Sequence, residues 1–214
     1  ALVSLGEKNA DYYFDSISAK LLTPEFLPRA LFERFRIEVL ATTDSPLDSL
    51  SDHDAIRSSG WKGRILPTFR PDPVVDPDFA GFTERIAALG QLTSKDTASW
   101  SGYLSALRQR RTFFRALGAT ASDHGHPTVQ TADLSPAEAE PIFSKVRTGG
   151  GTGADNELFR AQMLTEMARM SLDDGLVMQI HPGSFRNHNQ QVYEKFGRDT
   201  GADIPRPTNY VDAL

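Results

Sequence analysis

Four short apolar runs in this sequence are each followed by side chains that can do chemistry. The runs cover residues 37–40, 65–66, 116–119 and 176–180. The ionisable residues that follow them are, in order, Asp44, Arg70 with Asp72, Asp123 with His124, and His181. A histidine can move a proton near neutral pH, and an arginine can bind a carboxylate through two parallel hydrogen bonds. The pattern therefore indicates an enzyme with one active face.

Arg70 and Asp72 stand where the second run ends, in the string PTFRPD (67–72). The two prolines of this string restrict the backbone and would hold the arginine in one direction. An arginine held in this way suits a planar carboxylate of a substrate. An ion pair between Arg70 and Asp72 is an equally good interpretation of the spacing.

His181 follows five apolar residues and precedes Pro182 and Gly183, so we expect it to project from the end of its strand into a common cleft. Its imidazole could donate a hydrogen bond to a substrate oxygen or move a proton. The polar tract RNHN (186–189) follows at once and is either a binding loop or a surface turn. Its position beside His181 favours binding, with Arg186 as a candidate.

Asp123, His124 and His126 form a dense polar group after the third run. Two histidines two residues apart can bind one metal ion when the chain is extended. Gly125 lies between them and favours a turn. We therefore expect hydrogen bonds that shape a loop in preference to metal ligation.

Asp44 has two interpretations. With Ser45 it precedes Pro46, the order typical of a helix cap followed by proline in the first turn. This capping role is at least as well supported as catalysis. The helix would run to about Ser59 and end at Gly60.

These side chains need a scaffold that brings the ends of the apolar runs together. Segments with helical periodicity separate the runs, and strands that alternate with helices form parallel sheets. Ligands of such sheets bind at the carboxyl ends of the strands. The sequence therefore predicts an α/β protein. Four strands are too few for a closed barrel or for a usual doubly wound sheet, so either architecture implies further strands.

Helices are expected before the first strand and after the second. Residues 2–35 have the spacing of short helices, which Pro24 and Pro28 interrupt. The segment 73–115 predicts two helices, of which the first ends at Gly90. The second carries the basic residues Arg108, Arg110 and Arg111, which we expect on a solvated helix face.

Two more helices are expected between the third and fourth strands. The first begins at Ser135, with Pro136 and Glu138 behind it. The second starts near Asp155 and carries a stripe of methionines that predicts core packing. The string TGGGTG (148–153) between them lacks the lysine and the preceding strand of a phosphate loop, so we expect a flexible hinge.

Composition limits the class of function. With 214 residues, of which 39% are hydrophobic, the chain can bury a core. The net charge of -5 argues against nucleic acid as a partner, because proteins that bind it usually present a basic face. The sequence has no cysteine, which excludes disulfides and thiolate metal sites.

The sequence shows no segment that would target or anchor it. No apolar stretch is long enough to span a membrane, and the N-terminus lacks the pattern of a signal peptide. We expect a cytoplasmic location and no membrane partner. Because the sequence begins without Met and ends soon after Tyr210 with no tail, we also expect it to be an internal piece of a longer protein.

Five strings of the sequence form a recognisable set. They are ATTDSPLD (41–48), PTFRPD (67–72), GATASDHGH (118–126), ARMSLDDGLVMQIHPGSFRNHN (168–189) and FGRDTGADIP (196–205). Together they resemble uronate isomerase, also called glucuronate isomerase, of the amidohydrolase superfamily. The resemblance runs from about Pro28 onward, with the strings in the family's order.

The resemblance implies part of a distorted (β/α)8 TIM-like barrel, about strands 2 to 5, with extra helices. Residues 1–214 would form one partial barrel domain, with 1–35 as a helical lead-in and 73–115 as a helical excursion between strands. The family interconverts D-glucuronate with D-fructuronate and D-galacturonate with D-tagaturonate. A hydrogen moves between C2 and C1 through an enediol, and no organic cofactor takes part.

The resemblance also implies roles for residues and partners. Arg70 would bind substrate, as would Arg186 with less support, and His181 would be catalytic. Apart from the resemblance, Asp44, Asp72, Asp123 and His124 are candidates for supporting residues because of their places at the strand ends. The family uses a metal, typically zinc, held by a His-x-His pair of the first strand and an Asp of the last. Both would lie outside this chain, so we expect no metal ligand within it.

Two other functions stay open, a metal-dependent hydrolase of the same superfamily and a non-catalytic α/β protein that binds sugar acids. The expected partner is a uronate, and a homo-oligomer is compatible with the sequence. We expect the isolated chain to lack bound metal and isomerase activity, because half a barrel leaves two strand edges unpaired.

Overall fold

The computed structural model describes residues 6, 9–201 and 203–214. Residues 2–5, 7 and 8 of the expected helical segment lie outside the described residues. Contacts divide the chain into two compact units, Ala1–Leu40 with Ala55–Ile65 and Ala41–Asp54 with Leu66–Leu214. All the candidate site residues belong to the second unit.

Short helices make up most of the first unit. They are α1 (Ala10–Leu21), the 3-10 helix η2 (Pro24–Phe26) and α2 (Pro28–Arg34). Pro24 and Pro28 each occupy the first position of a helix, where proline's missing N–H costs nothing, so the expected interruptions are confirmed. Phe32 of α2 packs edge-on against Trp61, with 4.9 Å between ring centroids. The Trp61 indole N–H donates to Glu33 at 2.9 Å.

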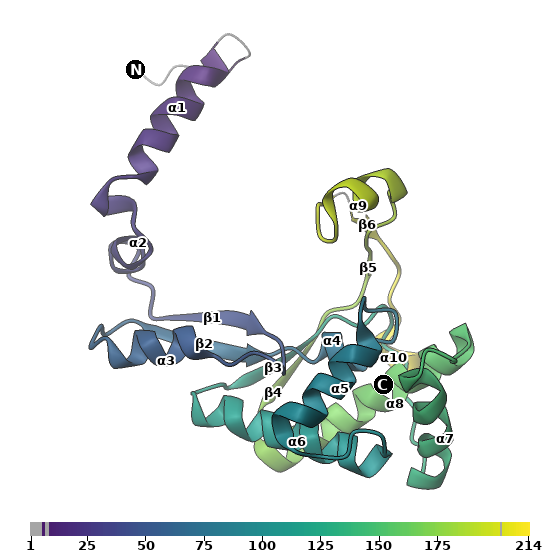
Figure 1. The fold of residues 1–214 in the computed structure, drawn as a ribbon. Coiled ribbons are helices and arrows are strands. Elements are labelled where there is room, and N and C mark those ends of the chain that lie inside the picture. The colour runs from purple at the N-terminus through teal and green to yellow at the C-terminus, as the bar shows by residue number, and fades with distance from the viewer. Residues whose placement is uncertain (1–5, 7–8, 202) are drawn as a thin grey trace. The chain divides into compact units, whose positions relative to one another are not determined.

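The strands form one four-stranded sheet, in the order β1 (Val39–Asp44), β2 (Arg64–Phe69), β3 (Ala121–His124) and β4 (Val177–Ile180) (Figure 1). The pairs β2 with β3 and β3 with β4 are parallel. Phe69 lies opposite Ser122, and His124 lies opposite Ile180. The predicted α/β fold with a parallel sheet is confirmed.

The third strand was predicted in the wrong place. Residues 116–119 do not form it, because Ala116 still belongs to the preceding helix and Gly118 adopts a φ of 97° beyond the helix end. The strand begins at Ala121 and contains Ser122, Asp123 and His124. A short apolar run does not by itself identify a strand, and here it contains the last residue of a helix and the turn that follows.

The helix after β1 ends about where predicted, but its start was predicted wrongly. The helix α3 (Ser51–Ser58) starts six residues after Ser45, and Asp44 is the last residue of β1. The polar residues between them shape turns: Ser45 Oγ accepts from the Leu47 N–H at 3.2 Å, and Asp48 Oδ1 accepts from the Leu50 N–H at 2.7 Å. Such local hydrogen bonds compete with helix formation. Asp44 is therefore not a helix cap.

Three helices connect β2 to β3, namely α4 (Asp72–Val75), α5 (Phe82–Thr93) and α6 (Trp100–Ala116). The helix α5 continues past Gly90, where we expected it to end, and stops before Ser94, whose φ is 54°. A Cβ at Gly90 would lie 2.5 Å from Thr97 Oγ1. This glycine therefore permits a close approach of the chain instead of ending the helix.

The basic residues of α6 do not form the solvated face that we expected. Arg108 is exposed, but Arg110 and Arg111 are buried, with 7% and 1% of their surface accessible. Arg111 donates to both carboxylate oxygens of Asp174, at 2.6 and 2.9 Å, and to Ser171. Arg110 donates to the carbonyls of Pro46 and Asp48, both at 2.6 Å.

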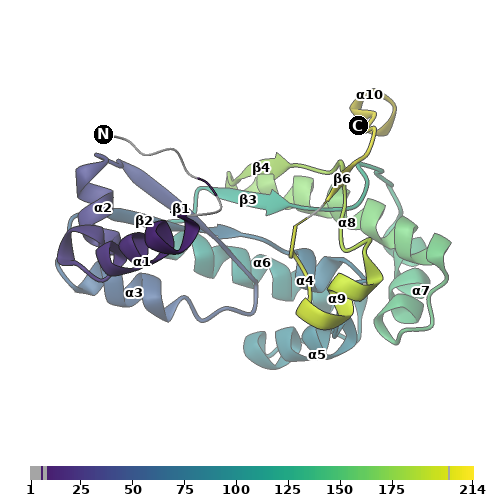
Figure 2. The same ribbon diagram turned by 90° about the horizontal axis from the view of Figure 1, so that it is seen from above.

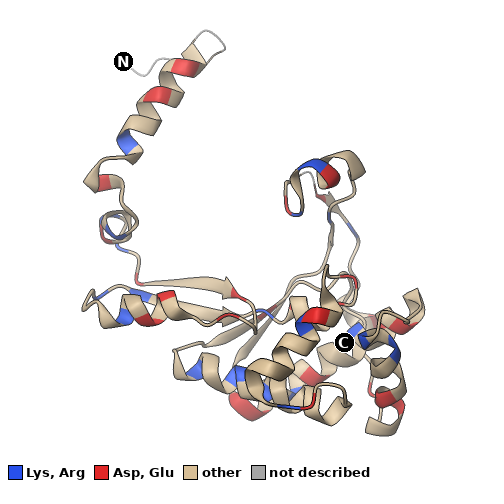
Figure 3. Ribbon diagram, in the orientation of Figure 1, with Lys and Arg blue, Asp and Glu red and all other residues tan. Residues whose placement is uncertain are grey.

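The helices α7 (Pro136–Arg147) and α8 (Gly153–Asp174) connect β3 to β4. The start of α7 is as predicted, and the Glu138 carboxylate accepts hydrogen bonds from the backbone N–H and the hydroxyl of Ser135. The string 148–153 links the two helices. Figure 3 shows acidic and basic residues interspersed along this part of the chain.

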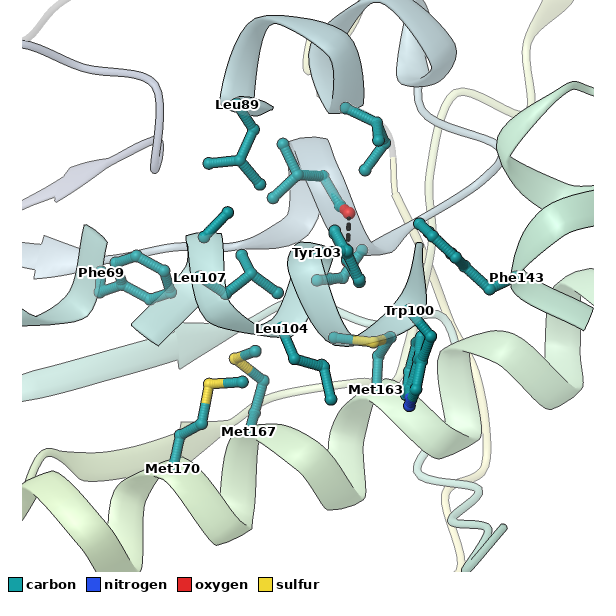
Figure 4. Packing of buried hydrophobic residues seen from close by; sticks show 14 of the residues in the cluster. Phe69, Leu89, Trp100, Tyr103, Leu104, Leu107, Phe143, Met163, Met167 and Met170 are labelled. Atoms are coloured by element: carbon teal, nitrogen blue, oxygen red, sulfur yellow. Dashed lines mark hydrogen bonds between the residues drawn. The ribbon is translucent and has the colours of Figure 1, made fainter. Parts of the chain in front are cut away.

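The main core lies where α6 meets α5, α7 and α8. Figure 4 shows Leu104 and Leu107 of α6 beside Met163, Met167 and Met170 of α8. These three methionines have at most 1% of their surface accessible, so the predicted core role of the methionine stripe is confirmed. The buried Tyr103 hydroxyl donates to the Val74 carbonyl at 2.7 Å, which joins α6 to α4.

After β4 the chain makes an excursion and returns (Figures 1 and 2). It consists of β5 (Ser184–Phe185), α9 (Gln190–Phe196) and β6 (Ile204–Pro205), with β5 and β6 paired antiparallel. The helix α10 (Tyr210–Ala213) follows. Among the described residues, no helix has both the length and the apolar character needed to cross a membrane.

Candidate active site

The carboxyl ends of neighbouring strands bring the candidate residues together. The Arg70 backbone N–H, just after β2, donates to the Asp44 carbonyl at the end of β1 at 2.9 Å. The His181 backbone N–H, just after β4, donates to the His124 carbonyl at the end of β3 at 3.1 Å. Asp123 precedes His124 on the same strand. The four predicted strand ends therefore form one edge of the sheet.

Arg70 is both ion-paired and partly exposed, so the two interpretations of its spacing do not compete. Its Nε donates to Asp72 Oδ2 at 2.8 Å, and its Nη1 lies 3.4 Å from Asp123 Oδ2. Burial would lower the pKa of Arg70, but its hydrogen bond to Asp72 and the charges of Asp72, Asp123 and Asp199 outweigh burial and raise the pKa. The side chain keeps 32% of its surface accessible. Arg70 can therefore contact a ligand as a permanent cation.

Asp72 connects this arginine to the chain after β3. Its two carboxylate oxygens accept from the Gly125 N–H at 3.1 and 3.2 Å. A Cβ at Gly125 would lie 2.5 Å from Arg70 Nη2, 2.7 Å from Asp72 Oδ2 and 3.2 Å from His181 Cε1. Only glycine fits here without displacing these side chains.

Asp123 lies between the arginine and the histidine. Its Oδ1 is 2.8 Å from His181 Nε2, while its Oδ2 is the atom that faces Arg70. The carboxylate accepts a hydrogen bond from the imidazole Nε2, which in a neutral ring leaves Nδ1 as the acceptor. The His181 side chain is 40% accessible, as expected for a residue that projects from the end of a strand.

His124 and His126 lie below this surface and are buried, at 0% and 3% accessible. His124 Nε2 is 2.9 Å from the Ser122 hydroxyl, a hydrogen bond within β3 instead of the loop-shaping bond that we expected. Burial lowers the pKa of both imidazoles, that of His124 well below its ordinary value, so both are neutral near pH 7. The described residues contain no group of three or more His, Cys, Asp or Glu that could hold a metal ion.

Asp44 faces the same edge of the sheet with a different set of contacts. The Thr42 hydroxyl donates to its Oδ2 at 2.7 Å, and His53 Nε2 lies 3.9 Å from that oxygen. The Thr42 hydroxyl also contacts His53 Nε2 at 2.8 Å. Asp44 is therefore held by neutral or weakly basic neighbours and stays available to accept hydrogen bonds from a ligand.

A pocket of about 420 Å³ opens beside Arg70, and among the described residues Asp123 and His181 are next to this arginine but are not part of the pocket lining. Its lining includes Asp44, Arg70, Asp72 and Gly125. The excursion after β4 adds Arg186, whose Nη1 lies 3.3 Å from Asp199 and 3.8 Å from Asp203. The volume suits a single small ligand.

The lining also includes residues for which the sequence analysis predicted no site role, among them Asp76, Phe79, Arg198 and Asp199. Arg198 and Asp199 belong to the string FGRDTGADIP, which carried the resemblance but no assigned role. Phe79 lies in a turn between α4 and α5, where nothing in the sequence distinguishes it from a core aromatic.

Charged side chains gathered at the carboxyl ends of successive parallel strands define a class of protein, an α/β protein with the strand-end arrangement of a (β/α) barrel. Solved structures agree. The crystal structure of glucuronate isomerase from Caulobacter crescentus matches with a TM-score of 0.93 and 55% identity, covering 99% of this chain and 44% of that one. The uronate isomerase of Thermotoga maritima matches with a TM-score of 0.90 and 27% identity, covering 99% and 47%. The fold is TIM-barrel-like.

The sequence places the chain more narrowly. The family model described as glucuronate isomerase matches residues 3–214, and the chain belongs to this family. Uronate isomerases of Rhizorhabdus wittichii and Xanthomonas axonopodis pv. citri are each 61% identical over 212 residues, which is 99% of this chain. The chain spans about half the length of these curated relatives, 46% and 45% respectively.

Proposed function

We propose that the full-length protein that carries this chain interconverts D-glucuronate with D-fructuronate and D-galacturonate with D-tagaturonate. The observation that carries the proposal is the connected set Arg70, Asp123 and His181 on three neighbouring strand ends, in a chain 61% identical to uronate isomerases. An isomerase of this kind must hold an anionic sugar, polarise a carbonyl and move protons. The set offers a cation, a carboxylate and an imidazole for these tasks.

Arg70 binds and orients the substrate in this proposal. Its guanidinium is a permanent cation, and its accessible side reaches the pocket, where a sugar carboxylate or a neighbouring hydroxyl can accept from it. The ion pairs with Asp72 and Asp123 fix the direction of the fork before substrate arrives. Such preorganisation lowers the entropic cost of holding the sugar in one orientation.

In this proposal His181 donates a hydrogen bond to a substrate oxygen and transfers a proton there. Isomerisation removes the proton from C2, forms an enediol and delivers a proton to C1, while a hydroxyl proton moves from O2 to O1. The substrate undergoes no net oxidation or reduction, so no organic redox cofactor is required. Asp123 holds the imidazole in one orientation and stabilises its protonated form, the role that a carboxylate partner usually plays beside a histidine.

Zinc would supply polarisation of the substrate carbonyl if it is bound as in the resemblance. The described residues of this chain do not form a donor set for it, since none of their His, Asp and Glu side chains gather in threes around one point. We therefore assign no metal ligand here, and the proposal leaves the zinc ligands to sequence beyond this chain. His124 and His126 stay buried supports of the site.

The setting of the reaction is also a proposal. We propose a cytoplasmic enzyme of carbohydrate metabolism. Its partner would be a free uronate, which is a small polar molecule. Self-association into a homo-oligomer stays a prediction.

The direct test is to incubate the purified full-length protein with D-glucuronate and, separately, D-galacturonate, and to follow the products by NMR. We expect the signals of the matching ketoses, with substrate and product together accounting for all the sugar. A hydrolase would leave free uronates unchanged and would cleave an ester or amide instead. Binding of uronate without any product would favour a sugar-acid binding protein.

A further inference from the structure

Arg198 differs from the other two arginines that line the pocket. Arg70 pairs with Asp72 and Asp123, and Arg186 faces two carboxylates of its own excursion. Within the part of the chain that the structure describes, Arg198 makes neither a hydrogen bond nor an ion pair. Its guanidinium lies over the ring of Phe79, with 4.1 Å between the guanidinium carbon and the ring centroid.

The contact with Phe79 positions the positive charge of Arg198 without using the N–H donors of the guanidinium. Phe79 is held by a turn in which its backbone N–H donates to the Asp76 carbonyl at 3.0 Å. A guanidinium over an aromatic face gains cation–π attraction, but its five N–H donors remain available. Phe79 therefore fixes Arg198 at the pocket wall while leaving it able to bind an anion.

Three of the four carboxylates that line the pocket are paired with other arginines. Asp72 binds Arg70, Asp199 faces Arg186, and Asp76 lies 3.0 Å from Arg160. The fourth, Asp44, accepts the Thr42 hydroxyl. Within the described residues none of the four pairs with Arg198, so its guanidinium is free to bind an anionic group of a ligand.

We propose that Arg198 binds the carboxylate of the uronate and makes the site prefer uronates over neutral sugars. The inference rests on the proposed function, which it deepens. Two of the donor atoms of Arg70, Nε and Nη1, already face Asp72 and Asp123, so Arg70 has less of its fork left for a second carboxylate. Arg198 has all of its fork left. The sugar carboxylate then lies toward Phe79, and the hydroxyls lie toward Asp44 and Arg70.

The test compares D-glucuronate with D-glucuronamide, which has the same shape but no charge at C6. In the full-length protein we expect Arg198→Met to raise KM for D-glucuronate about 10- to 100-fold, the loss expected for charge-assisted hydrogen bonds, with kcat changed much less. The dissociation constant of D-glucuronamide, measured by calorimetry, should stay the same. Arg198→Lys should give an intermediate KM because it keeps the charge but not the fork.

Arg206→Met is the matched control. Arg206 lies on the same excursion and also stands over an aromatic ring, that of Phe185 at 5.8 Å, but it lines a different pocket. This variant should keep the wild-type KM. Equal losses for D-glucuronate and D-glucuronamide in Arg198→Met would show a structural role and overturn the inference.

The calorimetric arm separates this inference from the proposed function. A wild-type protein that binds D-glucuronate more tightly than the amide but does not isomerise it would contradict the proposed function. Loss of that binding preference in Arg198→Met would still support the inference. Wild-type protein with no preference between the two ligands, or Arg198→Met that keeps the wild-type preference, would overturn the inference even if isomerisation is observed.

Discussion

Asp123 Oδ1 lies 2.8 Å from His181 Nε2, across the boundary between two neighbouring strands. The other oxygen of the same carboxylate faces Arg70 from the next strand at 3.4 Å. One carboxylate, with 14% of its side chain accessible, therefore contacts both the imidazole and the guanidinium. The connection brings three residues that are far apart in the sequence into one cluster.

Asp123→Asn should leave the fold intact and reduce kcat. The amide has nearly the shape of the carboxylate, but it cannot stabilise a protonated His181 or pair with Arg70. We expect kcat for D-glucuronate to fall about 100- to 10,000-fold, as when a carboxylate beside a catalytic histidine is neutralised. Asp133→Asn is the control, because Asp133 is exposed and pairs with Arg169 away from the pocket. Equal activity of the two variants would show that the contact with His181 is not used.

Arg70→Ala should reduce kcat/KM strongly, and Arg70→Lys should recover only part of it. The lysine keeps a positive charge but has no fork with which to contact Asp72, Asp123 and substrate together. Steady-state kinetics of the full-length protein would measure both variants. We expect a loss of about 100-fold or more for the alanine variant. An unchanged kcat/KM in Arg70→Ala would contradict the assigned role.

Gly125→Ala should disturb the site through one added methyl group. The new Cβ would fall 2.5 Å from Arg70 Nη2 and 2.7 Å from Asp72 Oδ2, so the ion pair between them must shift. Activity should fall by about 10-fold or more, since small misplacements of catalytic groups are costly. Gly153→Ala is the matched control, because a Cβ there meets nothing within 4 Å at the start of α8. A fully active Gly125→Ala variant would show that the packing around Arg70 is looser than the structure indicates.

Asp174→Asn should destabilise the fold by leaving the buried Arg111 without its carboxylate. Breaking one side of a buried pair costs about 3 kcal/mol or more. Burial opposes ionisation, but the hydrogen bonds from Arg111 lower the pKa of Asp174. The pair therefore stabilises the fold above the ordinary Asp pKa, about 4, and this stabilisation is lost as the pH falls through the lowered value. Urea unfolding of the variant at pH 7 measures the cost, and a midpoint equal to wild type would contradict it.

The buried histidines should make the fold less stable in mild acid. Burial lowers the pKa of His124 and His126, so the unfolded state binds protons first as the pH falls below about 6.5. Each contributes a loss of at most about 1.4 kcal/mol per pH unit below that value. His126→Leu should flatten the dependence of the unfolding free energy between pH 6.5 and 5, whereas His188→Gln, at an exposed position, should not. Identical slopes in both variants would show that His126 is not the group responsible.

Much of the candidate site could be predicted from the sequence because a buried parallel strand has a simple sequence pattern. An apolar run followed by polar residues locates the carboxyl end of a strand, and such ends share one edge of the sheet. Arg70, Asp123 and His181 were found in this way, and the structure places them in contact.

The errors have physical reasons of the same kind. The third strand was misplaced because the apolar residues 116–119 contain the last residue of α6 and the turn that follows it, and the strand begins only at Ala121. Arg110 and Arg111 were placed in solvent because a basic run does not reveal its partners, and the partner of Arg111 is 63 residues away in the sequence. The contact of Arg198 with Phe79 depends equally on tertiary structure.

The central claim is that Arg70, Asp123 and His181 form the active site of a uronate isomerase. The most direct measurement is the rate at which D-fructuronate appears from D-glucuronate, followed by NMR, with the full-length protein and its His181→Ala variant at matched thermal stability. We predict conversion by the wild-type protein and a rate at least about 100-fold lower in the variant. No conversion by the wild type, or equal rates in the two proteins, would contradict the claim.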